Sequence, residues 1–167
     1  MWKKIDPKEL SQNVFSLIGD QWMLVTAGEK DKCNTMTASW GGLGVLWGKP
    51  SATCYIRPQR YTKEFLDANE YFTLTFFAEE YRKALSLCGS KSGRELDKVK
   101  ECGFTVLEGE GGAPYFDQAK LALVCRKRFV QRMDSGNIPE DVKEKFYAQK
   151  DYHFIYIGEI VEVLVKE

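Results

Sequence analysis

The segment CNTMTASWGGLGVLWGKPSATCYIRPQRYT, residues 33–62, sets the pattern that organises the rest of the chain. Hydroxyl-bearing and apolar side chains alternate with a period of two in residues 35–40 and again in residues 51–57. This alternation is typical of strands that are buried on one face only. A glycine-rich stretch, residues 41–50, separates the two strands, and we expect it to form a loop. The segment therefore predicts two neighbouring strands, each with a face rich in hydroxyl groups.

The same segment ends at the start of a predicted helix, residues 62–69. Thr62 is the expected N-cap, and the first backbone N–H groups of a helix lack partners within it. These groups lie at the positive end of the helix dipole, where anions bind well. Arg57 and Arg60 can add charge-assisted hydrogen bonds. Two hydroxyl-lined strands beside a basic helix entrance indicate a site for a flat polar ligand with an anionic tail.

Each of these features also has an ordinary structural explanation. Thr62 can act as a cap alone, both arginines can be solvated, and threonine is common on the polar face of a sheet. Trp40 and Trp47 bracket the glycine-rich stretch, where they can wall a pocket for a planar ring or pack in the interior or at an interface. The loop 88–93 can close over a phosphate or serve as a solvated linker. From the residues alone, these alternatives stay open.

The composition restricts the class of protein. With 167 residues, of which 44% are hydrophobic, the chain predicts one domain, residues 1–167, with a sizeable core. Lysine plus arginine and aspartate plus glutamate number 24 each, so no excess of charge points to nucleic acid or to an anionic membrane. No apolar run reaches the roughly 20 residues of a membrane span, and residues 1–13 lack the apolar core of a signal peptide.

Cysteine and histidine usage argues against a metal site. The five cysteines contain no CxxC pair, which argues against a disulfide framework or structural zinc and favours a reducing, cytoplasmic setting. His153 is the only histidine, so a site with several histidine ligands is excluded. The motifs GxSxG, GxGxxG and GxxxxGK[ST] are absent, which argues against an α/β-hydrolase, a Rossmann domain and a P-loop NTPase.

The remaining segments predict a mainly β fold. Further strands are expected at residues 14–18, 22–27, 71–77, 104–107, 121–133, 152–157 and 160–165, and further helices at 79–88, 96–102 and 139–150. Gly158, between the last two strands, is expected to mark a bulge or a bend. Because the first four strands follow one another without helices between them, the pattern favours a closed antiparallel barrel with peripheral helices over a parallel doubly wound sheet.

Several runs of the sequence also carry a family resemblance. They are NTMTASWGG at 34–42, KP at 49–50, YIRP at 55–58, RYT at 60–62, FTL at 72–74, CGSKSG at 88–93, DK at 97–98, and His153 followed by GEI at 158–160. With these runs the chain resembles the flavin reductase-like, FMN-binding split-barrel family, and within it the flavoredoxin-type branch. The resemblance spans nearly the whole chain. It implies a six-stranded antiparallel split β-barrel of Greek-key type that forms a homodimer and binds one FMN per subunit at the dimer interface.

The resemblance also implies roles for individual residues. The isoalloxazine ring and ribityl chain would be lined by Thr35, Met36, Thr37, Ala38, Ser39 and Trp40. The phosphate would be held by Arg57, Arg60, Tyr61 and Thr62, with Ser90 and Lys91 as helpers. Since the position of Arg60 is not always basic in the family, Arg57 and Thr62 are the favoured phosphate ligands. Trp47 and His153 are candidates for contact with a substrate or with the second subunit.

Three functions follow as expectations. The first is an FMN-dependent oxidoreductase that takes a hydride from NADH or NADPH. The flavin then carries the chemistry, so no catalytic side chain is expected. The second is a flavoredoxin-like electron carrier with tightly bound FMN, which exchanges electrons with a redox protein and has no nicotinamide activity. The third is a barrel that binds a flavin or another ligand without being an enzyme.

Overall fold

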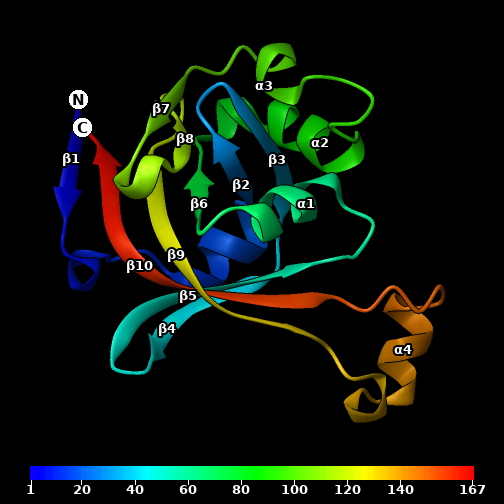
Figure 1. Ribbon diagram of the computed structural model, residues 1–167. Coiled ribbons are helices and arrows are strands. Elements are labelled where there is room, and N and C mark those ends of the chain that lie inside the picture. The colour runs from blue at the N-terminus through cyan, green and yellow to red at the C-terminus, as the bar shows by residue number, and fades with distance from the viewer.

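The computed structural model describes residues 1–167 (Figure 1). Its strands are β1 (Trp2–Ile5), β2 (Met23–Glu29), β3 (Lys32–Ala38), β4 (Gly41–Leu46), β5 (Lys49–Ile56), β6 (Tyr71–Phe76), β7 (Val106–Glu108), β8 (Pro114–Phe116), β9 (Leu121–Arg132) and β10 (Phe154–Lys166). Its α-helices are α1 (Tyr61–Ala68), α2 (Arg82–Ser90), α3 (Lys98–Glu101) and α4 (Glu140–Phe146). Five shorter helical segments are η1 (Pro7–Glu9), η2 (Ser16–Asp20), η3 (Glu79–Tyr81), η4 (Glu110–Gly112) and η5 (Ser135–Asn137).

Eight strands form one antiparallel sheet. Seven follow the order β3-β2-β6-β9-β10-β5-β4, and the eighth, β1, pairs with the last residues of β10. The end strands β3 and β4 are consecutive in the chain, yet each pairs only with its other neighbour, so the barrel is split between them. The predicted mainly β, antiparallel class is confirmed. The sheet has eight strands rather than six, and β7 and β8 form a separate hairpin.

The core lies inside the curved sheet and follows the alternation of the strands. Phe72, Leu74 and Phe76 of β6 are buried there, as predicted. Thr73 and Thr75 face the other side and are buried as well, because a second layer covers that side. The Thr73 hydroxyl donates to the carbonyl of Pro114 in β8 at 2.6 Å. In the same layer α2 packs on β3, and its Leu85 and Cys88 cluster with Leu24 of β2. Helix α1 packs on β2 and β3 from the core side, where Leu66 is buried.

Gly158 interrupts the ladder between β9 and β10, as predicted. The register shifts between Ile157 and Gly158. A side chain at this glycine would place its Cβ 2.8 Å from Cys125 Cβ and 2.8 Å from Phe72 Cε1. Only a residue without a Cβ lets β10 pass this close to the core, which is a common reason for glycine in a strand.

Residues 14–18, predicted as a strand, are helical instead. Leu17 N–H donates to the carbonyl of Asn13 at 2.9 Å, and the Asn13 side chain accepts from Phe15 N–H at 3.0 Å. Leu17 and Ile18 reach the core, whereas Phe15 is exposed. Apolar residues at 14, 17 and 18 have helical spacing, and Asn13 favours a helix start, so the strand prediction was wrong for a recognisable reason.

Residues 41–50, predicted as a loop, are mostly strand. Residues 41–46 form β4, which pairs with β5 in a hairpin closed by Trp47 and Gly48. Both turn residues have positive φ, +52° and +73°, as a tight two-residue turn requires. Gly41 is needed for close approach, since a Cβ there would lie 2.6 Å from the carbonyl oxygen of Thr53. The glycines of this stretch therefore belong to a strand that lies close to β5, and not to a loop.

The segment between β9 and β10 carries α4 away from the barrel, toward the lower right of Figure 1. It makes contact with the body near the end of β3, where Trp40 meets Phe146 edge to face at 5.2 Å. Both termini lie together at the opposite side of the molecule, beside β1 and β10. None of the helices combines the length and hydropathy that crossing a lipid bilayer requires.

Candidate functional site

A pocket of about 190 Å³ lies where β3 ends. The end of β5, the start of α1 and the residues before β10 form its other walls. It is lined by Met36, Thr37, Ala38, Ser39, Trp40, Tyr55, Arg57, Arg60 and His153. The sequence predicts every one of these as a site residue except Tyr55. Tyr55 shares the polar face of its strand with Arg57, and this alternation was the signal that could have identified it.

Arg60 occupies the N-cap position of α1 and extends toward α2. Its Nη1 donates to the carbonyl of Gly89 at 3.0 Å. Its Nη2 is buried and has no hydrogen-bond partner. Burial lowers the pKa of Arg60 from its ordinary value, but a guanidinium keeps its charge in a protein. The pocket wall therefore contains a buried cationic donor with unused hydrogen-bonding capacity.

Thr62 is not the N-cap of α1, contrary to prediction. The cap residue is Arg60, which makes no side-chain cap bond. Thr62 is buried in the first turn, where its hydroxyl accepts a hydrogen bond from Asn34 Nδ2 at 2.8 Å. Gly93 passes so close that a Cβ there would lie 2.0 Å from Asn34 Oδ1. Thr62 thus joins the start of α1 to Asn34 of β3, and Asn34 in turn lies close to Gly93 in the segment after α2.

The C-terminal half of α2 is held from outside by side chains. Three of its carbonyl groups accept hydrogen bonds from other elements: Leu85 from Thr37 Oγ1, Cys88 from Lys98 Nζ at 2.8 Å, and Gly89 from Arg60 Nη1 at 3.0 Å. Two of the donors are cations, which interact favourably with the negative end of the helix dipole. The end of α2 is thereby fixed against β3 and α1.

Lys98 was not identified as a site residue from the sequence. It is only 4% exposed, and its Nζ also donates to the carbonyl of Thr35 at 2.9 Å. Burial, and then the nearby charge of Arg60, lower the pKa of Lys98 to about 8. The only signal was its place in the DK run of the resemblance. The Thr35 side chain is fully buried, with its hydroxyl bonded to that of Thr26 at 2.8 Å, and does not line the pocket.

Arg57, the other predicted anion ligand, already has a carboxylate partner. Its Nη1 lies 3.1 Å from Asp151 Oδ2, and its guanidinium lies 5.1 Å from the centre of the Tyr147 ring. A hydrogen bond from Gln59, and further the charge of Arg57, lower the pKa of Asp151. Asp151 offsets the positive charge of Arg57, whereas Nη2 of Arg60 is buried and has no partner.

His153 is a buried, neutral residue in the pocket wall. Its Nδ1 lies 2.7 Å from the hydroxyl of Tyr147. Burial, and then the nearby Arg57, lower the pKa of His153 to about 4. The Trp40 ring lies 5.5 Å from the imidazole, and Tyr55 lies 6.4 Å from it. Aromatic groups therefore surround the histidine on the pocket side.

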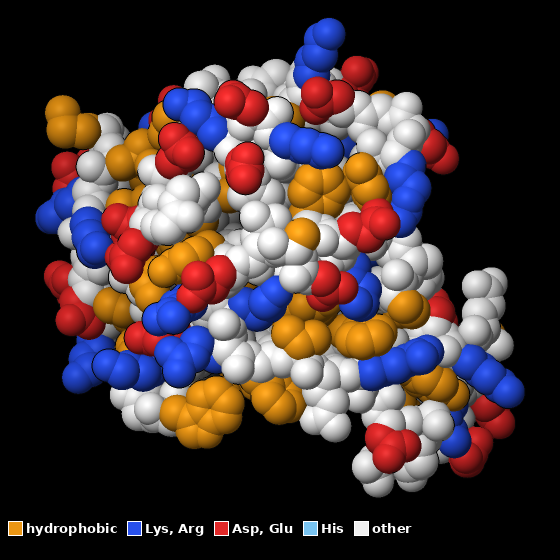
Figure 2. Space-filling view, in the orientation of Figure 1, with side chains coloured by type: hydrophobic (Ala, Val, Ile, Leu, Met, Phe, Trp, Pro, Cys, Tyr) orange, Lys and Arg blue, Asp and Glu red, His pale blue; other side chains and the backbone are white.

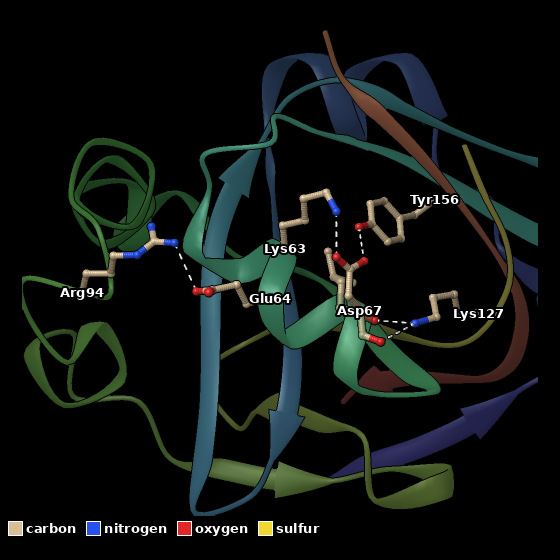
Figure 3. Close-up of polar contacts among 7 residues, drawn as sticks. Lys63, Glu64, Asp67, Arg94, Lys127 and Tyr156 are labelled. Carbon is tan, nitrogen blue, oxygen red and sulfur yellow. Dashed lines mark hydrogen bonds and ion pairs between the residues drawn. The ribbon is translucent and has the colours of Figure 1, made fainter. Parts of the chain in front are cut away.

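Polar contacts on both flanks hold α1 in place (Figure 3). Glu64 pairs with Arg94 at 3.1 Å, which ties the helix to the segment after α2. On the other flank Asp67 accepts hydrogen bonds from Lys63 at 2.7 Å and from the hydroxyl of Tyr156 in β10. These contacts fix the direction of α1, and hence the position of its first N–H groups.

Besides Thr35 and Thr62, four more predicted residues lie outside the pocket. Ser90 and Lys91 are exposed at the end of α2. Tyr61 faces a separate shallow groove of about 460 Å³, where its ring packs against Phe65 at 5.0 Å. Trp47 is 65% exposed at the tip of the β4–β5 hairpin. The structure does not bring these four side chains together with the pocket residues.

Comparison with known proteins was made for sequence and for structure. The model of the flavin reductase like domain matches residues 15–167. Among curated proteins, a high molecular weight rubredoxin from Moorella thermoacetica is 29% identical over 145 residues, which is 85% of this chain. The match covers 54% of that protein, so the chain spans about half the length of this relative.

Three solved structures illustrate the structural similarity. A flavoredoxin from Methanosarcina acetivorans has 23% identity and a TM-score of 0.71, over 99% of this chain and 75% of that one. A flavoredoxin from Desulfovibrio vulgaris (Miyazaki F) has 22% identity and a TM-score of 0.69, over 98% and 78%. An FMN-binding protein from Thermus thermophilus has 20% identity and a TM-score of 0.71, over 99% and 82%. At these identities the likeness concerns the fold.

Proposed function

Because the chain belongs to the flavin reductase-like family, we propose that it is an FMN-binding oxidoreductase that oxidises NADH or NADPH and passes the electrons to an acceptor. The cofactor would lie in the pocket at the end of β3. Family membership, and the FMN-binding protein among its structural neighbours, support this choice of cofactor.

The buried Nη2 of Arg60 is the observation that carries the proposal. An unpartnered buried donor costs free energy, and a cationic donor gains most from an anionic acceptor. The first turn of α1 begins at the next residue, and its N–H groups add favourable partial charge for a phosphate. Arg60 and the backbone of Tyr61 and Thr62 would therefore hold the phosphate. Arg57 would assist from the far side of the pocket.

The remaining pocket residues suit the ring and the ribityl chain. Residues 36–40 supply a mixed polar and apolar wall, and Trp40 and Tyr55 supply aromatic surface. When bound, FMN supplies the two-electron chemistry between a nicotinamide and an acceptor. His153 stays neutral at physiological pH, and because its Nδ1 is bonded to Tyr147, it offers only Nε2 to a ligand.

Residues outside the pocket would act indirectly. Thr35 and Thr62 hold the end of α2 and the start of α1, through Lys98 and Asn34 respectively. Ser90 and Lys91 remain proposed helpers at the exposed end of α2, where Lys91 adds positive charge.

The test of the proposal starts with the visible spectrum of the purified protein. We expect the two absorption bands of a flavin, with one FMN released per subunit on denaturation, and oxidation of NADH or NADPH when an acceptor is present. Arg60→Ala should lose FMN. Arg126→Ala, which removes an exposed arginine paired with Glu70 away from the pocket, should keep it. A folded protein that binds no added FMN would contradict the proposal and leave a non-flavin ligand-binding barrel.

A second candidate is a flavoredoxin-like electron carrier with tightly bound FMN. Two flavoredoxins among the similar structures, and a rubredoxin-named relative about twice as long as the matched region, favour it. The carrier would exchange electrons with a redox protein. Rapid reduction by a reduced rubredoxin-type protein, with slow reduction by both nicotinamides, would select the carrier. The opposite order of rates would select the reductase.

We propose a homodimer with FMN at its interface. Large apolar side chains stay exposed on the β4–β5 hairpin and beside the pocket: Val45 at 78%, Trp47 at 65% and Trp40 at 44%. Figure 2 shows hydrophobic side chains along the lower edge of the molecule, the edge that the hairpin forms in Figure 1. Apolar side chains that are exposed together mark interaction surfaces, whereas a single exposed apolar residue is normal.

Sedimentation of the wild-type protein should give a dimer. In Trp47→Asn, asparagine tolerates the positive φ of this position, so the variant should stay folded and dissociate into monomers. A monomeric wild-type protein would contradict the dimer.

A reducing, cytoplasmic location is also proposed, on the ground that all five cysteines are free. Fractionation of cells with an antibody to the chain would test it, and recovery outside the cytoplasm would contradict it.

A further inference from the structure

Two cysteines outside the pocket lie in contact with each other. Cys88 Sγ in α2 and Cys102 Sγ at the end of α3 are 3.7 Å apart. Cys88 is buried, and Cys102 is only partly covered. Of the other three cysteines, Cys33 is partly covered, and Cys54 and Cys125 are fully buried in the core.

We propose that Cys88 and Cys102 form a reversible disulfide when the protein meets a hydroperoxide, and that this bond locks the segment 89–101. The segment contains Ser90 and Lys91, and its Gly93 packs on Asn34 beside Thr62. The disulfide itself does not depend on the proposed function. Only its effect on FMN rests on that function.

The two thiols differ in how firmly they are held. Lys98 and Arg60 bind the carbonyls of Cys88 and of the next residue, so the Cys88 backbone is fixed. Cys102 follows a helix of four residues and precedes Gly103, which has a φ of +66° and no atom within 4 Å of where its Cβ would be. Closing 3.7 Å to the roughly 2.0 Å of a disulfide needs a shift of about 1.7 Å, which this short segment can supply.

The chemistry balances with hydrogen peroxide as the oxidant. The Cys102 thiolate attacks one peroxide oxygen and breaks the O–O bond. This gives a sulfenic acid, and the Cys102 proton leaves with the hydroxide as water. Cys88 sulfur then attacks Cys102 sulfur, and the S–O bond breaks. The hydroxide released takes the Cys88 proton and forms a second water. Two thiols lose two electrons in all, and one peroxide is reduced to two waters.

The pKa values of the two thiols determine how fast the disulfide forms. Burial, and then the neighbouring Cys102, raise the pKa of Cys88 to about 12, while Lys98 and Arg60 lower it in part. Burial also raises the pKa of Cys102, with Glu101 adding to the rise and the Cys88 hydrogen bond and Lys98 opposing it. Both thiols are protonated at neutral pH, so the bond forms slowly, as suits a response to sustained oxidation rather than a step in each turnover.

The disulfide should change both the stability of the protein and its affinity for FMN. A disulfide across thirteen intervening residues restricts the unfolded chain and the segment itself. We expect the midpoint temperature of unfolding to rise by roughly 5–10 °C on oxidation. Pre-ordering of residues 89–101 should also tighten FMN binding by roughly three- to tenfold.

The experiment treats the protein, residues 1–167, with hydrogen peroxide and counts free thiols. We expect the count to fall from five to three and to recover with dithiothreitol. Because lysines and arginines lie between the two cysteines, trypsin separates them, and a crosslinked peptide containing both identifies the bond by mass. Cys33→Ser, the matched control, should still lose two thiols. Cys102→Ser should lose none and show no rise in midpoint temperature.

Absence of the crosslinked peptide after oxidation would overturn the proposal, as would sulfinic acid at Cys102 in its place. If Cys102→Ser fails to fold, the wild-type peptide map decides alone. A disulfide that forms in a protein without FMN affinity would keep this inference and remove the proposed function, so the two failures can be told apart.

Discussion

Replacement of Arg60 by alanine should separate FMN binding from folding. In the protein without ligand, the arginine makes one hydrogen bond, to the carbonyl of Gly89, and leaves Nη2 buried without a partner. Its charge also lies close enough to Lys98 to lower the pKa of that lysine. One favourable bond is thus offset by an unmet donor and a like-charge contact. We expect the free energy of unfolding of the ligand-free protein to change by no more than about 1 kcal/mol.

The effect of Arg60→Ala on the affinity for FMN should be much larger than its effect on stability. A hydrogen bond from a charged donor to a phosphate contributes roughly 1.5–3 kcal/mol, which corresponds to an increase of about 10- to 150-fold in the dissociation constant. Arg60→Lys keeps the charge but loses the planar fork, and should fall between wild type and Arg60→Ala. Calorimetric titration of the apoprotein with FMN measures the affinity, and urea unfolding measures the stability.

Two checks make the reasoning refutable. The control Arg126→Ala removes an exposed arginine and should leave both quantities nearly unchanged. The pKa of Lys98, followed by NMR of the labelled ammonium group, should rise in Arg60→Ala because a neighbouring positive charge is gone. An FMN affinity within twofold of wild type in Arg60→Ala would refute the assignment of the phosphate to the start of α1.

Three further predictions concern the groups around the pocket. Thr62→Ala should lower the free energy of unfolding by roughly 1–3 kcal/mol in urea titrations, because it leaves the buried Asn34 amide without its acceptor; a neutral result would show that water replaces the hydroxyl. Gly93→Ala should destabilise by a similar or larger amount and weaken FMN binding, since the new Cβ would fall 2.0 Å from Asn34 Oδ1, and circular dichroism melts with unchanged midpoints would contradict this close approach. His153 has a pKa of about 4 in the folded protein and an ordinary value of 6.5. The unfolded chain therefore binds more protons between these two pH values, and stability should fall by roughly 1–3 kcal/mol as the pH drops through this range. His153→Gln should flatten that part of the stability profile, and an unchanged profile in this variant would assign the pH dependence to another group.

Residues 36–40 were predicted as site residues, and all five line the pocket. Residues 36–38 end β3, and residues 39 and 40 follow it, so the end of the strand rather than the alternation of its faces brings them together there. Lys98 could not be found in this way, because its role arises from carbonyls of β3 and α2 that only the tertiary fold brings together. Asp151 likewise could not be found from the sequence, because it lies 94 residues from Arg57 and only the tertiary fold pairs the two.

Element types were predicted best where local pattern and tertiary role agree. β6 and the Gly158 bulge are examples, since core packing reinforces the period of two. β4 was missed because glycine has little strand preference of its own; its pairing with β5 and the close approach at Gly41 stabilise it. β1 was missed because four polar and apolar residues at an edge carry no distinctive period, and only the last residues of β10 make them a strand.

The pairing of β10 has a consequence for how quickly the chain can fold. This strand pairs with β9, β5 and β1, so its partners come from the beginning, the first third and the last third of the sequence. Contacts between residues far apart in sequence are slow to form, because loop-closure entropy is lost before any contact is gained. Until β10 has been synthesised, the edges of β5 and β9 stay unpaired and open to other chains. Successful expression of this protein should therefore depend on keeping nascent chains dilute or protected by chaperones until that single strand closes the sheet.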